Sequence, residues 1–126
     1  MNYLVYLAGP LDGLDIDGTT WYDEFNKLKP DKLVGFMPGR AYLGAAGHAK
    51  SMDDANRAVI RVSLCVLANL SGPGRALGTI REIEFAVQHG KPVFVVGDLS
   101  ASLAAHDLTL CPDLEDAIYS IVKYYL

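Results

Sequence analysis

The sequence is poor in the features that mark several large classes of proteins. It has two cysteines, Cys65 and Cys111, and no CxxC pair, so we expect neither a disulfide framework nor a cysteine-based metal site. Its 11 Lys and Arg residues are outnumbered by 15 Asp and Glu residues. The resulting net charge of −4 argues against a nucleic-acid polymer as partner, although a free nucleotide needs only a local site. No apolar run approaches the roughly 20 residues that cross a membrane.

Targeting signals and metal-binding patterns are lacking as well. The opening residues, Met1 to Leu4, have no basic region of the kind that begins a signal peptide. The three histidines, His48, His89 and His106, are not spaced like metal ligands. We therefore expect a cytoplasmic protein that uses no metal and no other cofactor.

Apolar residues, in contrast, are plentiful enough for a folded core. They make up 51% of 126 residues, which suits one domain of ordinary size. No repeat, low-complexity tract or linker divides the chain. We therefore expect residues 1–126 to form a single domain.

Short apolar runs alternate with helical segments along the chain. The runs are continuous, which is typical of parallel strands that are buried on both faces. We predict an α/β fold: a single doubly wound, flavodoxin- or Rossmann-like domain with a four- or five-stranded parallel sheet and helices on both faces. The expected strands are 3–8, 33–37, 64–70, 92–96 and, more weakly, 108–110; the expected helices are 20–28, 51–62, 79–89 and 112–124, with 40–50 as a loop.

The loop after the third expected strand is a candidate ligand site. Parallel sheets of this kind bind ligands at the carboxyl ends of their strands. Residues 71–78 contain three glycines and lead into a helix, so their backbone N–H groups could approach an anion. The glycine spacing fits neither a P-loop nor the dinucleotide fingerprint, and an ordinary turn explains it equally well.

Glu82 and Tyr6 each allow two interpretations. Thr79 and Glu82 have the spacing of a capping box, in which the glutamate serves only the helix start. The same position favours a charged carboxylate at the mouth of the sheet, where it could act as a nucleophile. Tyr6, near the end of the first strand, is either a core residue or a side chain that points into the same crevice.

Three motifs resemble the nucleoside 2-deoxyribosyltransferase family, which includes the 2′-deoxynucleoside 5′-monophosphate N-glycosidases. Residues 6–10 (YLAGP) resemble the opening motif of the family, and residues 77–83 (LGTIREI) resemble the segment that carries its nucleophile. Residues 90–93 (GKPV) resemble the strand that follows. The resemblance implies that Glu82 attacks C1′ of a 2-deoxyribosyl group, that Tyr6 orients Glu82, and that a base or water resolves the glycosyl-enzyme.

The resemblance also implies a set of substrate-binding residues from the loops and helix starts. The matching glycines and threonine would line the sugar site, and the family contacts its base from the first loop, where the aspartates also suit an acidic turn or a weak cation site. The arginines do not come from the family pattern: they could hold a phosphate as charge-assisted donors, or be ordinary surface residues. The candidates are Gly9, Pro10, Asp12 (with Asp15 and Asp17), Asp53, Asp54, Arg75 (with Arg40), Gly78 and Thr79.

The chain departs from the family pattern at four positions. Counting back from the third strand places the base-contacting aspartate of the family at Ala55, so Asp54 or Asp53 would serve only if the helix shifts in register. The other departures are Ser63 in place of an aspartate, Ala76 in place of a serine of the monophosphate-specific branch, and Glu84 in place of a small residue.

Three functions therefore stay open at this point. The leading hypothesis is an N-glycosidase or deoxyribosyltransferase that acts on a small nucleoside or nucleotide and works as a homo-oligomer, a dimer or higher. The alternative is a non-catalytic nucleotide-binding module on the same fold. The third is a domain for protein association, with Tyr119, Tyr124 and Tyr125 as its contact surface.

Overall fold

The computed structural model describes residues 2–9, 21–38, 49–70, 77–97 and 107–126. Within these ranges the chain forms five strands and four helices. They are β1 (Tyr3–Ala8), α1 (Trp21–Leu28), β2 (Leu33–Phe36), α3 (Ala49–Val62), β3 (Cys65–Leu70), α4 (Leu77–Gln88), β4 (Val93–Gly97), β5 (Thr109–Cys111) and α5 (Leu114–Tyr125).

The five strands form one parallel sheet in the order β2-β1-β3-β4-β5. The predicted α/β architecture is therefore confirmed, with the weak run at 108–110 contributing the fifth strand one residue later. Strand order reverses between β1 and β3, where Tyr6 lies opposite Val66 and Ala8 opposite Ala68. The carboxyl ends of these two strands are the switch point at which such sheets bind ligands.

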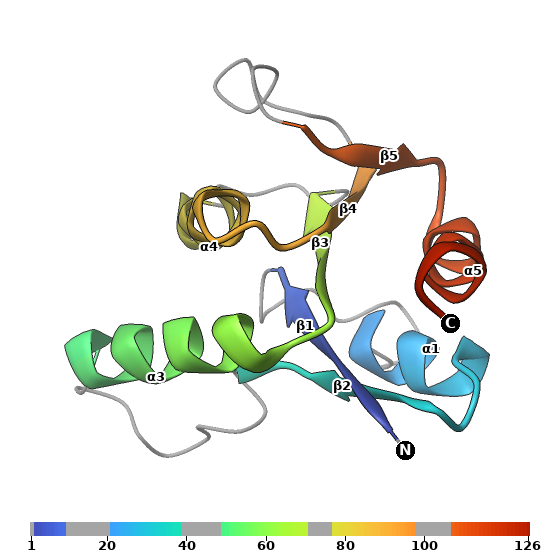
Figure 1. Ribbon diagram of the computed structural model, residues 1–126, viewed down its shortest axis with the longest axis horizontal. Helices are drawn as coiled ribbons and strands as arrows, with labels where there is room; N and C mark the ends of the chain where they lie inside the picture. Colours follow the sequence, from blue (N-terminus) through green and yellow to red (C-terminus); the bar gives the residue numbers. More distant parts are fainter. Residues whose placement is uncertain (1, 10–20, 39–48, 71–76, 98–106) are drawn as a thin grey trace.

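Helices cover both faces of the sheet. Figure 1 shows α3 and α4 on one side and α1 and α5 on the other. Alternate residues of β1 belong to the two separate cores: Val5 and Leu7 pack with α1 and α5, whereas Tyr6 and Ala8 pack with α3 and α4. Burial on both faces explains why the strands read as continuous apolar runs. No helix in the described part of the chain is long and apolar enough to cross a membrane.

The helix starts differ from the expected ones. α3 begins at Ala49 and α4 at Leu77, each two residues early, so Ser51 and Thr79 lie inside helices rather than at their N-caps. α5 begins at Leu114, two residues late, because Asp113 is its N-cap and accepts a 2.8 Å hydrogen bond from the Asp116 N–H. Ser and Thr are good caps, but the same residues also occur within helices.

Candidate active site

Tyr6 and Glu82 lie on the same side of the sheet. Tyr6 is fully buried in the core that also contains Ile60 of α3 and Ile83 of α4. Glu82 is half-buried and directly precedes Ile83. The Tyr6 hydroxyl oxygen and Glu82 Oε2 are both closed to solvent. The layer between the sheet and the α3–α4 pair thus contains two of the residues that the resemblance singles out.

The capping-box explanation of Glu82 is wrong. Because α4 begins at Leu77, Thr79 is its third residue and its first turn holds no acidic residue. Thr79 is instead part of the buried face of α4, with 5% of its surface exposed, together with Ile83 and Ala86. Glu82 lies one turn after Thr79, so its carboxylate is not needed to satisfy the backbone at the helix start.

Tyr6 is held by its neighbours on β1 and β2. Its ring packs against that of Phe36, with centroids 5.9 Å apart and planes tilted by 32°. Because Tyr6 pairs in register with Phe36 on β2 and with Val66 on β3, its backbone is fixed from both sides. The ring is therefore a rigid element, as a residue that orients another side chain must be.

α3 contributes a polar residue that the sequence did not single out. Asn56 lies one turn before the fully buried Ile60, on the same face of α3. Its Oδ1 is closed to solvent and has no hydrogen-bond partner in the described ranges. Since α3 joins two parallel strands, it runs opposite to them, and Asn56 lies near the middle of this helix. The position four residues before a core isoleucine is the signal that could have identified Asn56.

The candidates next to Asn56 behave differently. The Asp54 side chain is exposed, so its carboxylate does not lie on the buried face of α3. Ala55 is half-buried and has no polar side-chain group. Asp53 belongs to α3 by its backbone, and its side chain lies outside the described part. The count back from the third strand, which gave Ala55, passes Asn56 by one residue.

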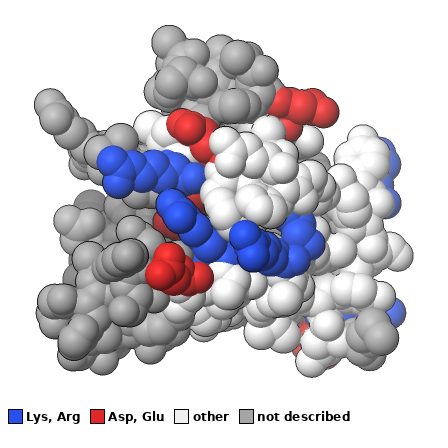
Figure 2. Space-filling view, turned by 60° about the vertical axis from the view of Figure 1, so that its left-hand side comes forward, with Lys and Arg blue, Asp and Glu red and all other residues white. Residues whose placement is uncertain are grey.

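Phe85 of α4 packs on the outer side of the contact between α3 and α4. The guanidinium carbons of Arg57 and Arg61 each lie 5.5 Å from the centre of its ring, and the His89 ring stacks at 4.0 Å. Figure 2 shows Lys and Arg side chains gathered across this side of the molecule. Phe85 thus ties α3 to the helix that carries Glu82.

Gly9, a predicted sugar-site residue, has a packing role at the end of β1. A Cβ at Gly9 would lie 2.7 Å from Cζ2 of Trp21, closer than side chains tolerate, so only glycine fits against the indole. Gly78 is the second residue of α4. The remaining candidates, Pro10, Asp12 and Arg75, lie outside the described residues, as do Asp15, Asp17, Arg40 and Ala76.

Two of the departures from the family pattern also lie in the described part. Ser63 is buried and ends α3: its hydroxyl donates to the Val59 carbonyl at 2.7 Å, and its own carbonyl accepts from Lys91 Nζ at 2.8 Å. Glu84 is half-buried on α4. Ser63 therefore has a structural task at the junction of α3 and β3.

The two thiols are poor alternatives to Glu82 as a nucleophile. Burial raises the pKa of Cys65 to about 12, although the charge of Lys91 partly opposes the rise. Burial also raises the pKa of Cys111, with the negative charge of Asp116 adding to it. Both thiols stay protonated at neutral pH, whereas the thiolate is the nucleophilic form. Among the described residues, no group of three or more His, Cys, Asp or Glu could hold a metal ion.

Comparison with known proteins places this geometry in a family. The sequence profile of the family described as nucleoside 2-deoxyribosyltransferase matches residues 5–114. A 2-desoxiribosyltransferase from Leishmania mexicana has a similar structure, with a TM-score of 0.74 and 21% identity, over 98% of this chain and 99% of that one. A 2-deoxyribosyltransferase from Bacillus psychrosaccharolyticus gives a TM-score of 0.72 and 14% identity, over 98% and 92%. No curated protein matches the chain by sequence.

Proposed function

Because the chain belongs to the nucleoside 2-deoxyribosyltransferase family, we propose that it cleaves the N-glycosidic bond of a 2′-deoxynucleoside or its 5′-monophosphate. The observation that carries the proposal is the burial of the Glu82 carboxylate oxygen and the Tyr6 hydroxyl in one layer beside the switch point of the sheet. A carboxylate with one oxygen closed to solvent suits a nucleophile, because water at the carboxylate would compete for the glycosyl group.

The proposed reaction is a double displacement at C1′. A Glu82 carboxylate oxygen forms a bond to C1′ while the bond from C1′ to the base nitrogen breaks, and the base leaves with the electron pair. A second base, or water, then attacks C1′ and displaces the carboxylate. Each transition state has oxocarbenium character, so a nearby negative charge stabilises it.

Tyr6 is the proposed positioning residue for Glu82. A tyrosine hydroxyl can donate one hydrogen bond to a carboxylate oxygen and thereby leave the other oxygen directed at C1′. The rigid packing of the Tyr6 ring against Phe36 supports this role, because a fixed donor restricts the carboxylate to one orientation.

Turnover by a Glu82 variant tests the proposal. The protein is incubated with a panel of 2′-deoxynucleosides and their 5′-monophosphates, with and without a free acceptor base, and released base is measured. We expect release by the native protein and a loss of at least about a thousand-fold in Glu82→Gln, because the nucleophile is removed while the shape is kept. Release that requires the acceptor base indicates transfer, and release without it indicates hydrolysis.

Two results would contradict the proposal. Full turnover by Glu82→Gln would show that another group is the nucleophile. Nucleotide binding that raises Tm without any base release would instead favour the non-catalytic binding module. The neutral amide of Asn56 on α3 is the observation that keeps this second function open, because it lacks the carboxylate that the family uses nearby.

A further inference from the structure

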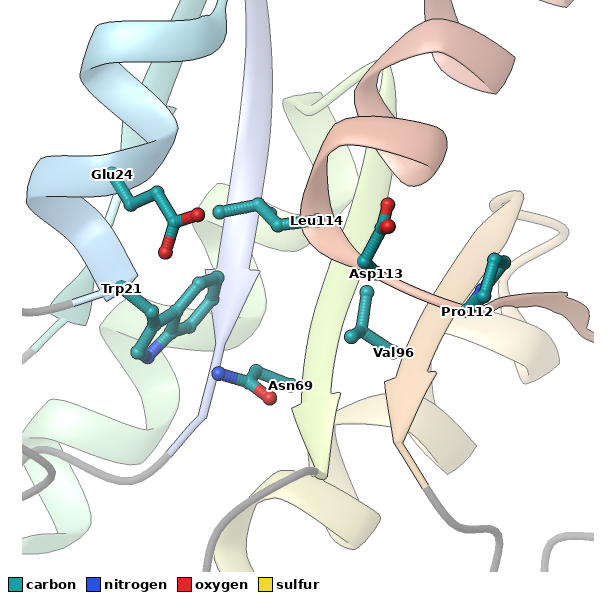
Figure 3. A pocket seen from close by; sticks show the side chains of 7 residues that line it. All are labelled: Trp21, Glu24, Asn69, Val96, Pro112, Asp113 and Leu114. Atoms are coloured by element: carbon teal, nitrogen blue, oxygen red, sulfur yellow. The ribbon is translucent and has the colours of Figure 1, made fainter.

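A pocket lies on the face of the sheet opposite to Tyr6 and Glu82. Its volume is about 290 Å³. It is lined by Trp21 and Glu24 of α1, Asn69 of β3, Val96 of β4, Pro112 and Asp113 before α5, and Leu114 of α5 (Figure 3). On β3, Leu67 belongs to the α1–α5 core and Ala68 to the α3–α4 core, so Asn69 faces α1 and α5. The pocket therefore lies on the opposite face of the sheet from the proposed catalytic layer, near the carboxyl ends of β3 and β4.

The charged side chains of the pocket are both carboxylates. Glu24 and Asp113 are exposed, and Figure 3 shows them on opposite sides of the hollow. Oδ1 of Asp113 accepts the Asp116 N–H, and the charge of the carboxylate remains at the rim. No Lys or Arg is among the lining residues. Such a rim attracts cations and repels phosphates and carboxylates.

Trp21 forms a fixed aromatic wall of the pocket. It is only 8% exposed, and its indole is wedged against Gly9, where a Cβ would come within 2.7 Å. An aromatic face held in this way is a favourable surface for a cation or a flat ring. Val96 and Leu114 supply apolar wall opposite the indole. The pocket thus combines negative charge at its rim with apolar and aromatic walls.

We propose that this pocket binds a small organic cation with a flat or apolar body, such as a protonated amine or amidine. The carboxylates would pair with the cationic group, and the indole and aliphatic side chains would cover the body. The volume is at the lower end of the range of about 300–1,000 Å³ for ligand pockets, so a molecule with a single ring fits best. No step of the proposed glycosidic reaction uses this pocket.

Fluorescence gives a direct test, because Trp21 is the single tryptophan of the chain. Full-length protein is titrated with benzamidinium, and benzamide serves as a neutral control of nearly the same shape. We expect a saturable change in tryptophan emission with benzamidinium, weakened by added salt, and little change with benzamide. Equal binding of benzamide would overturn the proposal, because charge would then play no part.

Variants assign the binding to the pocket. Glu24→Gln and Asp113→Asn should each raise the Kd for benzamidinium about two- to five-fold, since each removes one partly exposed charge pair. Asparagine still caps a helix, so Asp113→Asn leaves α5 intact. Glu115→Gln, also on α5 but not lining the pocket, should leave the Kd unchanged. An unchanged Kd in both pocket variants, or a loss of binding in Glu82→Gln, would overturn the assignment.

Discussion

Asn56 places a neutral amide on the buried face of α3, within the layer that holds Tyr6 and Glu82. A carboxylic acid in that layer could give a proton to the leaving base, whereas an amide can only accept or donate hydrogen bonds. A buried carbonyl oxygen without a partner is costly, so a ligand that donates to it gains affinity. At the residue scale, we expect Asn56 Oδ1 to accept a hydrogen bond from a donor group of the base, such as an exocyclic amine.

Substitution of Asn56 should change base preference and pH dependence. In Asn56→Ala we expect kcat/KM to fall about three- to ten-fold for deoxynucleosides whose base carries an amine, and less for those without one, because one hydrogen bond is lost. In Asn56→Asp we expect turnover to rise as the pH falls through the pKa of the new carboxyl, which then protonates the base.

The test compares the pH–rate profiles of the native protein, Asn56→Ala and Asn56→Asp, measured with one deoxynucleoside, to show whether Asn56 contacts the base. A new acidic step that appears only in Asn56→Asp supports contact with the base. If both variants shift Tm alone, with unchanged profiles and unchanged base preference, then Asn56 is a packing residue.

At the element scale, the contact between α3 and α4 fixes how Asn56 and Glu82 lie relative to each other. Phe85 of α4 contributes to that contact, because the guanidinium groups of Arg57 and Arg61 of α3 both lie over its ring. Loss of this ring should therefore affect stability and catalysis together, because the helices would be free to shift.

Phe85→Ala should lower the free energy of unfolding by about 1–3 kcal/mol, from lost apolar burial and lost cation–π contacts. Phe85→Leu keeps most of the apolar contact and should cost less. Tyr119→Ala, at a position that is 63% exposed, is the matched control and should change stability little. Urea unfolding curves measure all three. Equal stability of Phe85→Ala and the native protein would show that the helices are held elsewhere.

The sequence predicts the elements better than it predicts their starts. Short continuous apolar runs separated by helical segments indicate a parallel sheet, because strands buried on both faces need apolar side chains on both. The starts of α3 and α4 are missed because Ser51 and Thr79 look like caps, and only the backbone shows that they lie within helices. Asn56 is missed because the position was counted back from the strand, and the helical spacing to Ile60, which puts Asn56 on the buried face of α3, was not used.

At the scale of the whole molecule, two candidate regions lie on opposite faces of the sheet. Tyr6 and Glu82 belong to the α3–α4 side, and the pocket beside Trp21 belongs to the α1–α5 side. The pocket is lined by residues from four separate stretches of chain, so no single sequence motif indicates it. The local information in the sequence is the alternation of side chains along β1 and β3, where neighbouring residues point to opposite faces of the sheet.

If the two regions are separate, ligands bound at them should act independently. We expect benzamidinium and a deoxynucleoside to raise Tm additively in Glu82→Gln, which binds the nucleoside without consuming it. The Kd for either ligand should change by less than about two-fold when the other is present, since sites without shared partners add. Fluorescence titration of Trp21 with and without saturating nucleoside measures this coupling. Strong competition would mean that both ligands enter one continuous site, because the free energy of coupling between two sites acts equally on both ligands.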